Sequence, residues 1–349
     1  MEQKRQYNLD LFRIFACVMV LILHAAGHNW SKVSPESAAW QAFNFYDVLV
    51  RSAVPLFFML SGKLFLSRDD ISLKRLFSKN IFKLVFVYFL WSFLYAVDTI
   101  GLKSLMTSFD LSQLWSVFVS GKYHLWYLPS LISVYLLIPV FISIKSYKNG
   151  KMLDYIAILF FIFSIAGYSI QLLPLDGSVT ELFRKFSFVF DGYCGYFLFG
   201  HILDKYSERL KRIPTFVLVF LFFITVSATA AGSCFLSVRA GKGIAVLYDG
   251  FFISTFVEAA TIFMLFLRFP QLNLSKTAGK VIQKLSKYTL FVYLFHPYVI
   301  EHVYLWFGLD TLSFAPVLSV PLISLGLFAV CVAVAMILDK IPFVRKVLL

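Results

Sequence analysis

Two residues of the first apolar segment, Arg13 and His24, have side chains and a spacing that suit joint chemistry. The segment, NLDLFRIFACVMVLILHAAGH, covers residues 8–28 and is long enough to cross a bilayer. His24 follows Arg13 by 11 positions, close to three helical turns, so a helix would carry both on one face, about 16 Å apart. An ionisable side chain at mid-membrane costs on the order of 3 kcal/mol and usually faces a polar interior. Arg13 and His24 are therefore the first functional candidates.

Each of the two residues also has a purely structural interpretation. The Arg13 side chain could extend to the cytoplasmic interface and only anchor the helix. His24 could be a neutral imidazole that bonds a backbone carbonyl inside a helix bundle. Their position on a common face favours the functional interpretation over two independent structural ones.

The composition indicates an integral membrane protein. The chain has 349 residues, of which 60% are hydrophobic and 15% are charged, a balance that no water-soluble domain has. No loop is long enough for a separate soluble domain, so we expect residues 1–349 to form a single transmembrane domain. The first segment contains Arg13 and has no small-residue cleavage site, which predicts a retained helix rather than a signal peptide.

The apolar pattern predicts an all-α, polytopic bundle of about ten transmembrane helices. The segments are 9–29, 45–66, 81–98, 126–144, 152–172, 188–204, 214–232, 249–268, 286–305 and 317–338. Of the 32 Lys and Arg residues, 22 fall on one side of this arrangement, 7 fall on the other, and 3 lie within segments. The positive-inside rule then predicts that both termini are cytoplasmic, and it accounts for the net charge of +13.

This topology assigns a depth to each buried polar residue. Arg13 would lie in the cytoplasmic leaflet and His24 in the outer half, while Arg51 would enter from outside to a depth similar to that of His24. Asp47 precedes Arg51 by four residues and can pair with it, so a local interfacial ion pair without chemistry is the alternative for Arg51. Pro55 would kink this helix and open a cavity there.

Four further residues are candidates on the outer side or at mid-membrane. His124 and Trp126 lie in KYHLWYLPSL at the outer interface, where an aromatic belt also explains the tryptophan. Glu258 lies near mid-membrane and needs a cationic or hydrogen-bonding partner. His296 lies near the middle of the ninth segment, and Pro297 permits a kink beside it. The histidines are scattered along the chain, so we expect no metal site.

Taken in order, these motifs resemble the acyltransferase family 3 membrane proteins. The resemblance rests on Arg13 followed after ten residues by His24, on Arg51 and VPLFFMLSGKLF, on HLWYL, and on YTLFVYLFHP near the end. It spans almost the whole chain, which looks like the stand-alone polysaccharide O-acetyltransferase branch. The resemblance implies transfer of an acyl group, usually acetyl from cytoplasmic acetyl-CoA, to a glycan hydroxyl outside the bacterial cytoplasmic (inner) membrane. Acetyl-CoA would be a co-substrate, with no permanently bound cofactor.

The resemblance and the predicted depths together imply a role for each candidate. Arg13 would bind the donor phosphates by charge-assisted hydrogen bonds, helped by Lys63 or by the basic loop of Lys74, Arg75 and Lys79. The catalytic residues would be His24, as general base or transient acyl carrier, and Arg51, which would stabilise the oxyanion or orient His24. The acceptor side would be lined by His124, Trp126, His296 and Glu258.

Two other functional classes fit the same composition. A transporter or flippase of a lipid-linked glycan or small anion would line its pathway with similar polar residues. Transport would move its substrate without covalent change, and no internal repeat stands out between the two halves, which disfavours the common transporter folds. A sensor or scaffold is the third class, and the buried cations count against it.

Overall fold

The chain folds as an all-helical bundle. The computed structural model describes residues 6–172, 178, 181, 185, 192–270, 272 and 274–347, and these residues form helices without any strand. The all-α prediction is therefore confirmed.

Eight helical stretches within the described residues are long and apolar enough to cross a membrane. They are α1 (Tyr7–Trp30), α2 with α3 (Ala38–Val50 and Ala53–Leu66), α4 through α5 (Leu73–Ile100), α8 (Tyr127–Lys145), α9 through α10 (Lys151–Gln171), α14 (Thr215–Ala240), the 3-10 turn η4 with α15 (Val246–Leu267), and α17 (Pro316–Leu338). Each is close to the ~20 residues that span the hydrocarbon core. The chain is thus a polytopic membrane bundle, and the count of ten helices stays a prediction.

The other two predicted segments correspond to α16 and α12. Helix α16 (Lys276–Phe307) has 32 residues, which is long enough to span, but it contains several Lys residues as well as His296 and Glu301. Helix α12 (Cys194–Lys205) has 12 residues, and residues 188–191 of its predicted segment lie outside the described part of the chain. Polarity in α16 and shortness in α12 explain why neither is among the eight.

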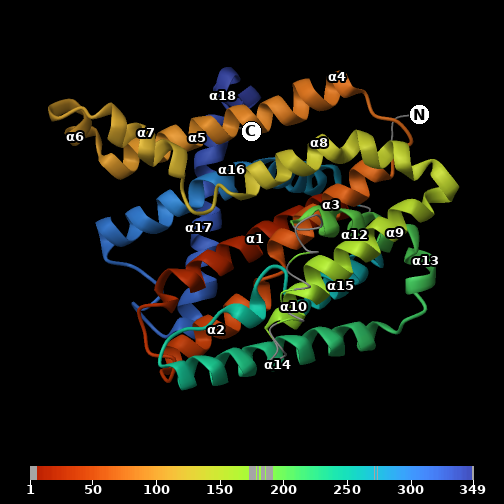
Figure 1. Ribbon diagram of the computed structural model, residues 1–349. Coiled ribbons are helices and arrows are strands. Elements are labelled where there is room, and N and C mark those ends of the chain that lie inside the picture. The colour runs from red at the N-terminus through yellow and green to blue at the C-terminus, as the bar shows by residue number, and fades with distance from the viewer. Residues whose placement is uncertain are drawn as a thin grey trace.

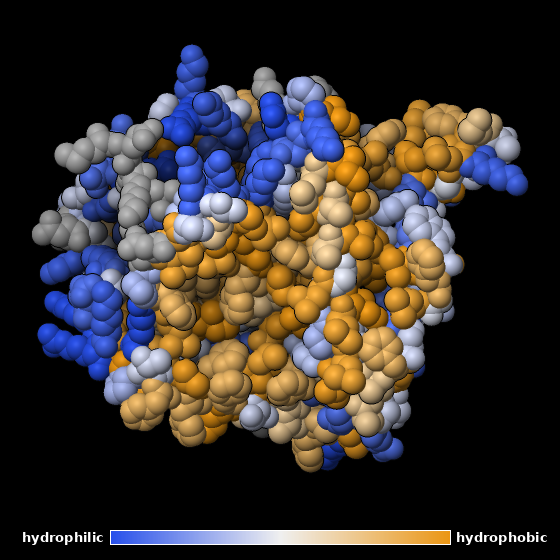
Figure 2. Space-filling view, turned by 180° about the vertical axis from the view of Figure 1, so that it is seen from behind, coloured by the Kyte–Doolittle hydropathy of each residue, from blue (hydrophilic) through white to orange (hydrophobic). Residues whose placement is uncertain are grey.

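Helix α1 lies in the middle of the bundle, where it packs against α2, α3, α16 and α17 (Figure 1). The short helices α6 (Leu102–Thr107) and α7 (Leu111–Ser120) project from one end of the bundle. Figure 2 shows a broad apolar face whose left and upper margins carry most of the hydrophilic side chains in that view. A bilayer requires such an apolar exterior, because only helices with internally satisfied backbones can face lipid.

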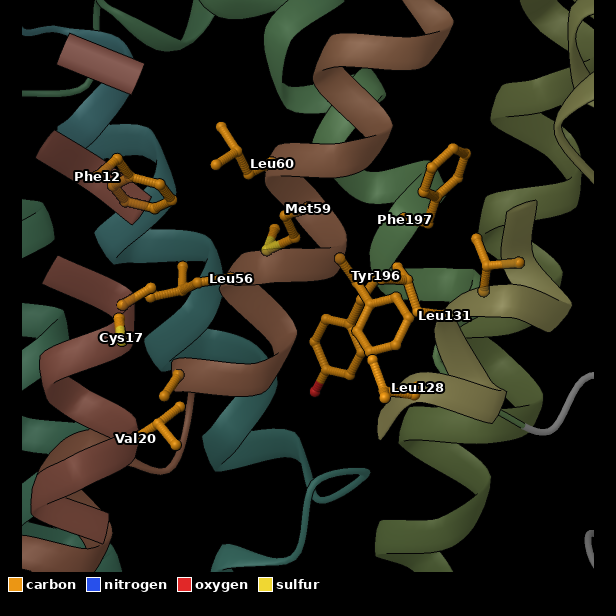
Figure 3. Close-up of a cluster of buried hydrophobic side chains, with 14 of the residues drawn as sticks. Phe12, Cys17, Val20, Leu56, Met59, Leu60, Leu128, Leu131, Tyr196 and Phe197 are labelled. Atoms are coloured by element: carbon orange, nitrogen blue, oxygen red, sulfur yellow. The ribbon is translucent and has the colours of Figure 1, made fainter. Parts of the chain in front are cut away.

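The core around α1 and α3 has tightly packed side chains and one close backbone contact. Figure 3 shows side chains of α1, α3, α8 and α12 converging, among them Phe12, Leu56 and Leu131. Helices α3 and α12 touch through glycines: a Cβ at Gly62 would lie 1.7 Å from the Phe197 carbonyl oxygen. A Cβ added at Gly200 would likewise meet the backbone of α3. This pair of helices can therefore approach only because both positions lack a side chain.

The second predicted span is broken rather than continuous. Helix α2 ends at Val50, α3 begins at Ala53, and Arg51 and Ser52 form a turn between them. Pro55 lies in the first turn of α3, where its missing N–H is least costly. The sequence predicted a kink at this depth, and the structure places the Arg51 side chain at the break itself.

Candidate functional site

Three histidines from distant parts of the chain meet inside the bundle. His24 comes from α1, His124 from the turn before α8, and His296 from α16. The ring centroids of His24 and His296 are 4.9 Å apart, and those of His124 and His296 are 5.6 Å apart. His24 is half-buried, whereas His124 and His296 are 2% and 0% exposed. The predicted catalytic histidine thus contacts a predicted acceptor-side histidine, and we call these three residues the histidine cluster.

Tyrosine rings surround the histidine cluster, and two tyrosine hydroxyl groups donate hydrogen bonds to backbone carbonyls beside it. Ring centroids of Tyr95 and Tyr293 lie 5.2 Å and 5.4 Å from that of His124. The Tyr293 hydroxyl donates to the His124 carbonyl, and the Tyr95 hydroxyl donates to the Leu294 carbonyl at 2.7 Å. Sequence reasoning missed these tyrosines. Tyr293 precedes His296 by three residues, a spacing that could have identified it as a neighbour on the same helix face.

An ion pair joins the turn that carries His124 to α16. Lys122 lies in the same turn as His124, and its Nζ is 2.7 Å from Glu301 Oε2 on α16. A second contact lies farther along α16, where the Nε2 atom of His302 is 3.4 Å from Asp98 Oδ1 on α5. The Lys122–Glu301 pair therefore connects the elements that carry His124 and His296.

The cluster is an arrangement of stacked and edge-to-face rings. The His24 and His296 rings are tilted by 30°, and the His124 and His296 rings by 71°. Within the described part of the chain, no three His, Cys, Asp or Glu side chains have positions that could hold a metal ion. The chemistry that this arrangement favours is proton transfer and hydrogen bonding.

Arg51 forms a second group with residues of α2 and η4. Its Nη2 is 2.5 Å from Asp47 Oδ1, and its guanidinium lies 4.8 Å from the centroid of the Tyr248 ring. The predicted Asp47–Arg51 pair is therefore present. Arg51 Nε has no hydrogen-bond partner among the described residues. A guanidinium has five N–H donors, so the ion pair leaves donors for another group.

Glu258 of α15 is a buried carboxyl group. It is 0% exposed, and neither of its carboxylate oxygens has a hydrogen-bond partner within the described residues. The cationic or hydrogen-bonding partner that the sequence required for Glu258 stays a prediction, as does its place on the acceptor side.

The two predicted donor-binding residues, Arg13 and Lys63, differ in the ion pairs that they form. Arg13 Nη1 lies 3.6 Å from Asp10 Oδ1, and the Arg13 side chain is 37% exposed although α1 is central. Lys63 forms an ion pair with Asp204 of α12. The structure therefore leaves Arg13 more available to an anionic ligand than Lys63, whose charge is already neutralised.

Trp126 lines a separate pocket at the N-terminal end of α8. This pocket has a volume of about 430 Å³ and is lined by Trp126, Ser130, Gly192, Tyr193 and Phe251. The Trp126 and Tyr193 ring centroids are 5.2 Å apart, and Trp126 is 44% exposed.

Comparisons with known proteins agree with the resemblance in the sequence. A family model described as an acyltransferase domain, that of acyltransferase family 3, matches residues 6–338. An amino-acid racemase of Enterococcus faecalis is 25% identical over 344 residues, 94% of this chain and 45% of that protein. A serine/alanine racemase of Enterococcus gallinarum is 27% identical over 315 residues, 84% of this chain and 40% of that protein. The chain thus spans less than half the length of these curated relatives. No solved structure matches it.

Proposed function

Because the chain belongs to acyltransferase family 3, whose model covers residues 6–338, we propose that it is a membrane O-acyltransferase of the bacterial cytoplasmic membrane. Family membership supports an acyltransferase in general. The specific proposal is that an acyl group, most simply acetyl, moves from cytoplasmic acyl-CoA to a hydroxyl of an extracytoplasmic or lipid-linked cell-surface glycan.

The observation that carries this proposal is that Arg13 and His24 lie on one face of α1. Arg13 lies toward one end of that face with an accessible guanidinium, and His24 lies toward the other, in contact with His296. A donor bound at Arg13 from inside and a hydroxyl arriving from outside would meet at the histidine cluster. This division suits a reaction whose two substrates come from opposite sides of a membrane.

His24 and Arg51 would share the chemical step. His24 is suited to take the proton of the acceptor hydroxyl, which contributes about 10²–10⁴-fold to a rate. Arg51 has N–H donors beyond its ion pair, and these donors could stabilise the oxyanion of the tetrahedral intermediate. Both roles place the reaction on the outer side of the predicted topology.

Arg13 rather than Lys63 would be the main donor contact. A guanidinium can bind phosphate with two parallel hydrogen bonds, and Asp10 at 3.6 Å does not occupy it closely. Lys63 would contribute only if its pair with Asp204 opened.

Racemisation and transport are weaker proposals for this chain. The racemase names describe proteins of which the chain spans 45% and 40%, so their activities as whole proteins do not carry over. A transporter or flippase would use the same polar interior and leave its substrate chemically unchanged.

Mass spectrometry of envelope glycans from cells with and without the gene tests the proposed function. We expect a mass gain of one acyl group that appears only with the gene and is removed by mild alkali, as an ester should be. Identical glycan masses, accompanied by gene-dependent movement of the glycan or an anion across the membrane, would instead identify a transporter.

A further inference from the structure

His296 has a defined tautomer in this fold. Its Nδ1 lies 3.2 Å from the Val292 carbonyl oxygen, one turn earlier in α16. A carbonyl only accepts hydrogen bonds, so Nδ1 must carry the hydrogen and Nε2 of the neutral ring must carry the lone pair. The backbone of α16 thereby fixes which nitrogen of His296 can accept a proton or a hydrogen bond.

The accepting nitrogen of His296 is buried and unused. His296 is 0% exposed, and its Nε2 has no hydrogen-bond partner among the described residues. A buried polar atom without a partner costs on the order of 1–3 kcal/mol, so its persistence suggests a role in function. The rings that lie near the His296 ring are those of His24 from α1, His124 from the turn before α8, and Tyr293 from its own helix.

The His24 ring is the neighbour best placed to use this atom. With ring centroids 4.9 Å apart, rotation of the His24 ring can bring one of its N–H groups within hydrogen-bond distance of His296 Nε2, while the Val292 carbonyl holds the His296 ring in place. Catalytic hydrogen bonds are often long in the absence of substrate and shorten when it binds. We propose, on the basis of the proposed acyl transfer, that His296 is a positioning residue whose Nε2 accepts a hydrogen bond from His24.

This hydrogen bond would fix the tautomer of His24. One nitrogen of His24 would donate to His296, and the other would carry the lone pair that takes the proton of the acceptor hydroxyl. The hydroxyl oxygen then forms the new bond to the acyl carbon, the C–S bond of the acyl-CoA thioester breaks, and His24 gives its proton to the departing thiolate. Val292, His296 and His24 form a chain in which each member orients the next, as the aspartate orients the histidine in a serine hydrolase triad.

Substitutions that keep or remove the acceptor atom test this role. In His296→Phe the ring shape stays and the acceptor is lost, so we expect kcat to fall at least tenfold with an unchanged KM for acyl-CoA. In His296→Gln the amide oxygen can reach the former position of Nε2, and we expect it to recover a substantial part of kcat. Inverted membrane vesicles that contain envelope glycans, supplied with radiolabelled acetyl-CoA, provide the assay.

His302 offers a matched control on the same helix. Its Nδ1 bonds the Tyr298 carbonyl at 2.9 Å in the same way, but its Nε2 faces Asp98 rather than the cluster. We expect His302→Phe to keep near-parental kcat. Equal kcat for parent and His296→Phe would overturn the positioning role while leaving the proposed function intact. Equal losses in His296→Phe and His296→Gln would make His296 merely structural. Absence of transfer by the parent would refute both proposals.

Discussion

Arg51 illustrates how one residue can fit both a structural and a catalytic explanation. It pairs with Asp47 at 2.5 Å, as a local ion pair would, and its Nε has no hydrogen-bond partner in the described part of the chain. Because α2 and α3 separate at Arg51, its backbone is not part of a regular helix. The two explanations differ in what each substitution of the pair should do.

Neutralising Arg51 should cost more activity than neutralising its partner. Removing a group that stabilises an oxyanion costs about 10²–10³-fold in kcat, so we expect Arg51→Gln to lose activity on that scale. Asp47→Asn leaves the guanidinium in place and should lose at most about tenfold. Acyl transfer by membrane vesicles at matched protein levels gives the comparison. Equal losses in the two variants would indicate that Arg51 serves only the ion pair.

Arg13 should govern the use of the donor. We expect Arg13→Ala to raise the KM for acyl-CoA by about tenfold or more, since loss of a charge-assisted hydrogen bond costs about 1.5–3 kcal/mol. Arg13→Lys should recover less if a bidentate contact is needed. Lys63→Ala is the matched control and should change the KM little, because Lys63 pairs with Asp204. A rise in KM confined to Lys63→Ala would move the donor site there.

At the scale of single residues, the sequence predicted relations within one helix better than contacts between helices. The spacing of Arg13 and His24 follows from helical geometry, and Asp47–Arg51 follows from the i,i+4 rule. The contact between His24 and His296 joins residues 272 positions apart, and the Lys63–Asp204 pair joins residues 141 apart. Local periodicity carries no information about such pairs, because it does not say which helices pack together.

Helices α3 and α12 form an element-scale feature that depends on two glycines. A Cβ at Gly62 would lie 1.7 Å from the Phe197 carbonyl oxygen, a contact that only backbone movement can relieve. We expect Gly62→Ala to destabilise the protein by about 1–3 kcal/mol, as overpacking does. The fraction that stays monodisperse after heating in detergent, followed by size-exclusion chromatography, measures this loss.

Gly326 in α17 is the control for that substitution. Nothing lies within 4 Å of a Cβ added there, so Gly326→Ala should be neutral or stabilising by up to about 1 kcal/mol through helix propensity. Similar thermal profiles for Gly62→Ala and the parent would contradict the close contact of α3 with α12.

Asp339 joins the C-terminal end of α17 to α16 and should make stability depend on pH. Its carboxylate accepts hydrogen bonds from Lys287 Nζ at 2.6 Å and from the Tyr288 hydroxyl at 2.9 Å. The hydrogen bond from Lys287 holds the pKa of Asp339 below its ordinary 3.8. A pKa that is lower in the folded state gives stability that is present above pH 3.8 and is lost as the pH falls through the lowered pKa.

The Asp339→Asn variant should therefore be less stable than the parent near neutral pH, and this difference should shrink below pH 3.8. Thermal unfolding in detergent at both pH values measures it. Glu208→Gln is the control, because Glu208 pairs with Lys211 at 82% exposure and should contribute little at either pH. A stability difference that is the same at both pH values would contradict the pH-linked role of Asp339.

The bounds of the helices were predicted more accurately than the form of the break between α2 and α3. Helix α17 matches its predicted segment, 317–338, closely, because a span needs little besides length and hydropathy. Helix α14 begins one residue after its predicted start at 214 but continues to Ala240, beyond the predicted end at 232. The break between α2 and α3 depends on how Pro55 is accommodated, and a proline permits either a kink or a new helix start. The sequence therefore located the distortion without determining its form.

The topology of the whole molecule can be tested on the two ends of one helix. Lys211 and Lys242 lie just beyond the two ends of α14, and both are exposed. From the distribution of basic residues we expect Lys242→Cys to react with an impermeant thiol reagent in intact cells. Lys211→Cys should react only after the cells are permeabilised.

The parent protein supplies the background for this labelling. Cys17, Cys194 and Cys331 are buried, and Cys234 is partly buried and bonded to Gln41, so all four should react slowly. Labelling of Lys211→Cys, but not of Lys242→Cys, in intact cells would reverse the orientation and place His24 toward the cytoplasm. The donor and acceptor would then have to exchange sides.

The central claim, that His24 acts as a base in acyl transfer, is tested most directly by the transfer rate of His24→Gln. Glutamine keeps hydrogen-bonding capacity but cannot take a proton, so the loss of one core hydrogen bond, about 1 kcal/mol, can be separated from the loss of a base. We expect His24→Gln to insert at near-parental levels and to transfer label from acetyl-CoA to envelope glycans about 10²–10⁴-fold more slowly. A His24→Gln variant that transfers acyl groups at the parental rate would show that His24 is structural.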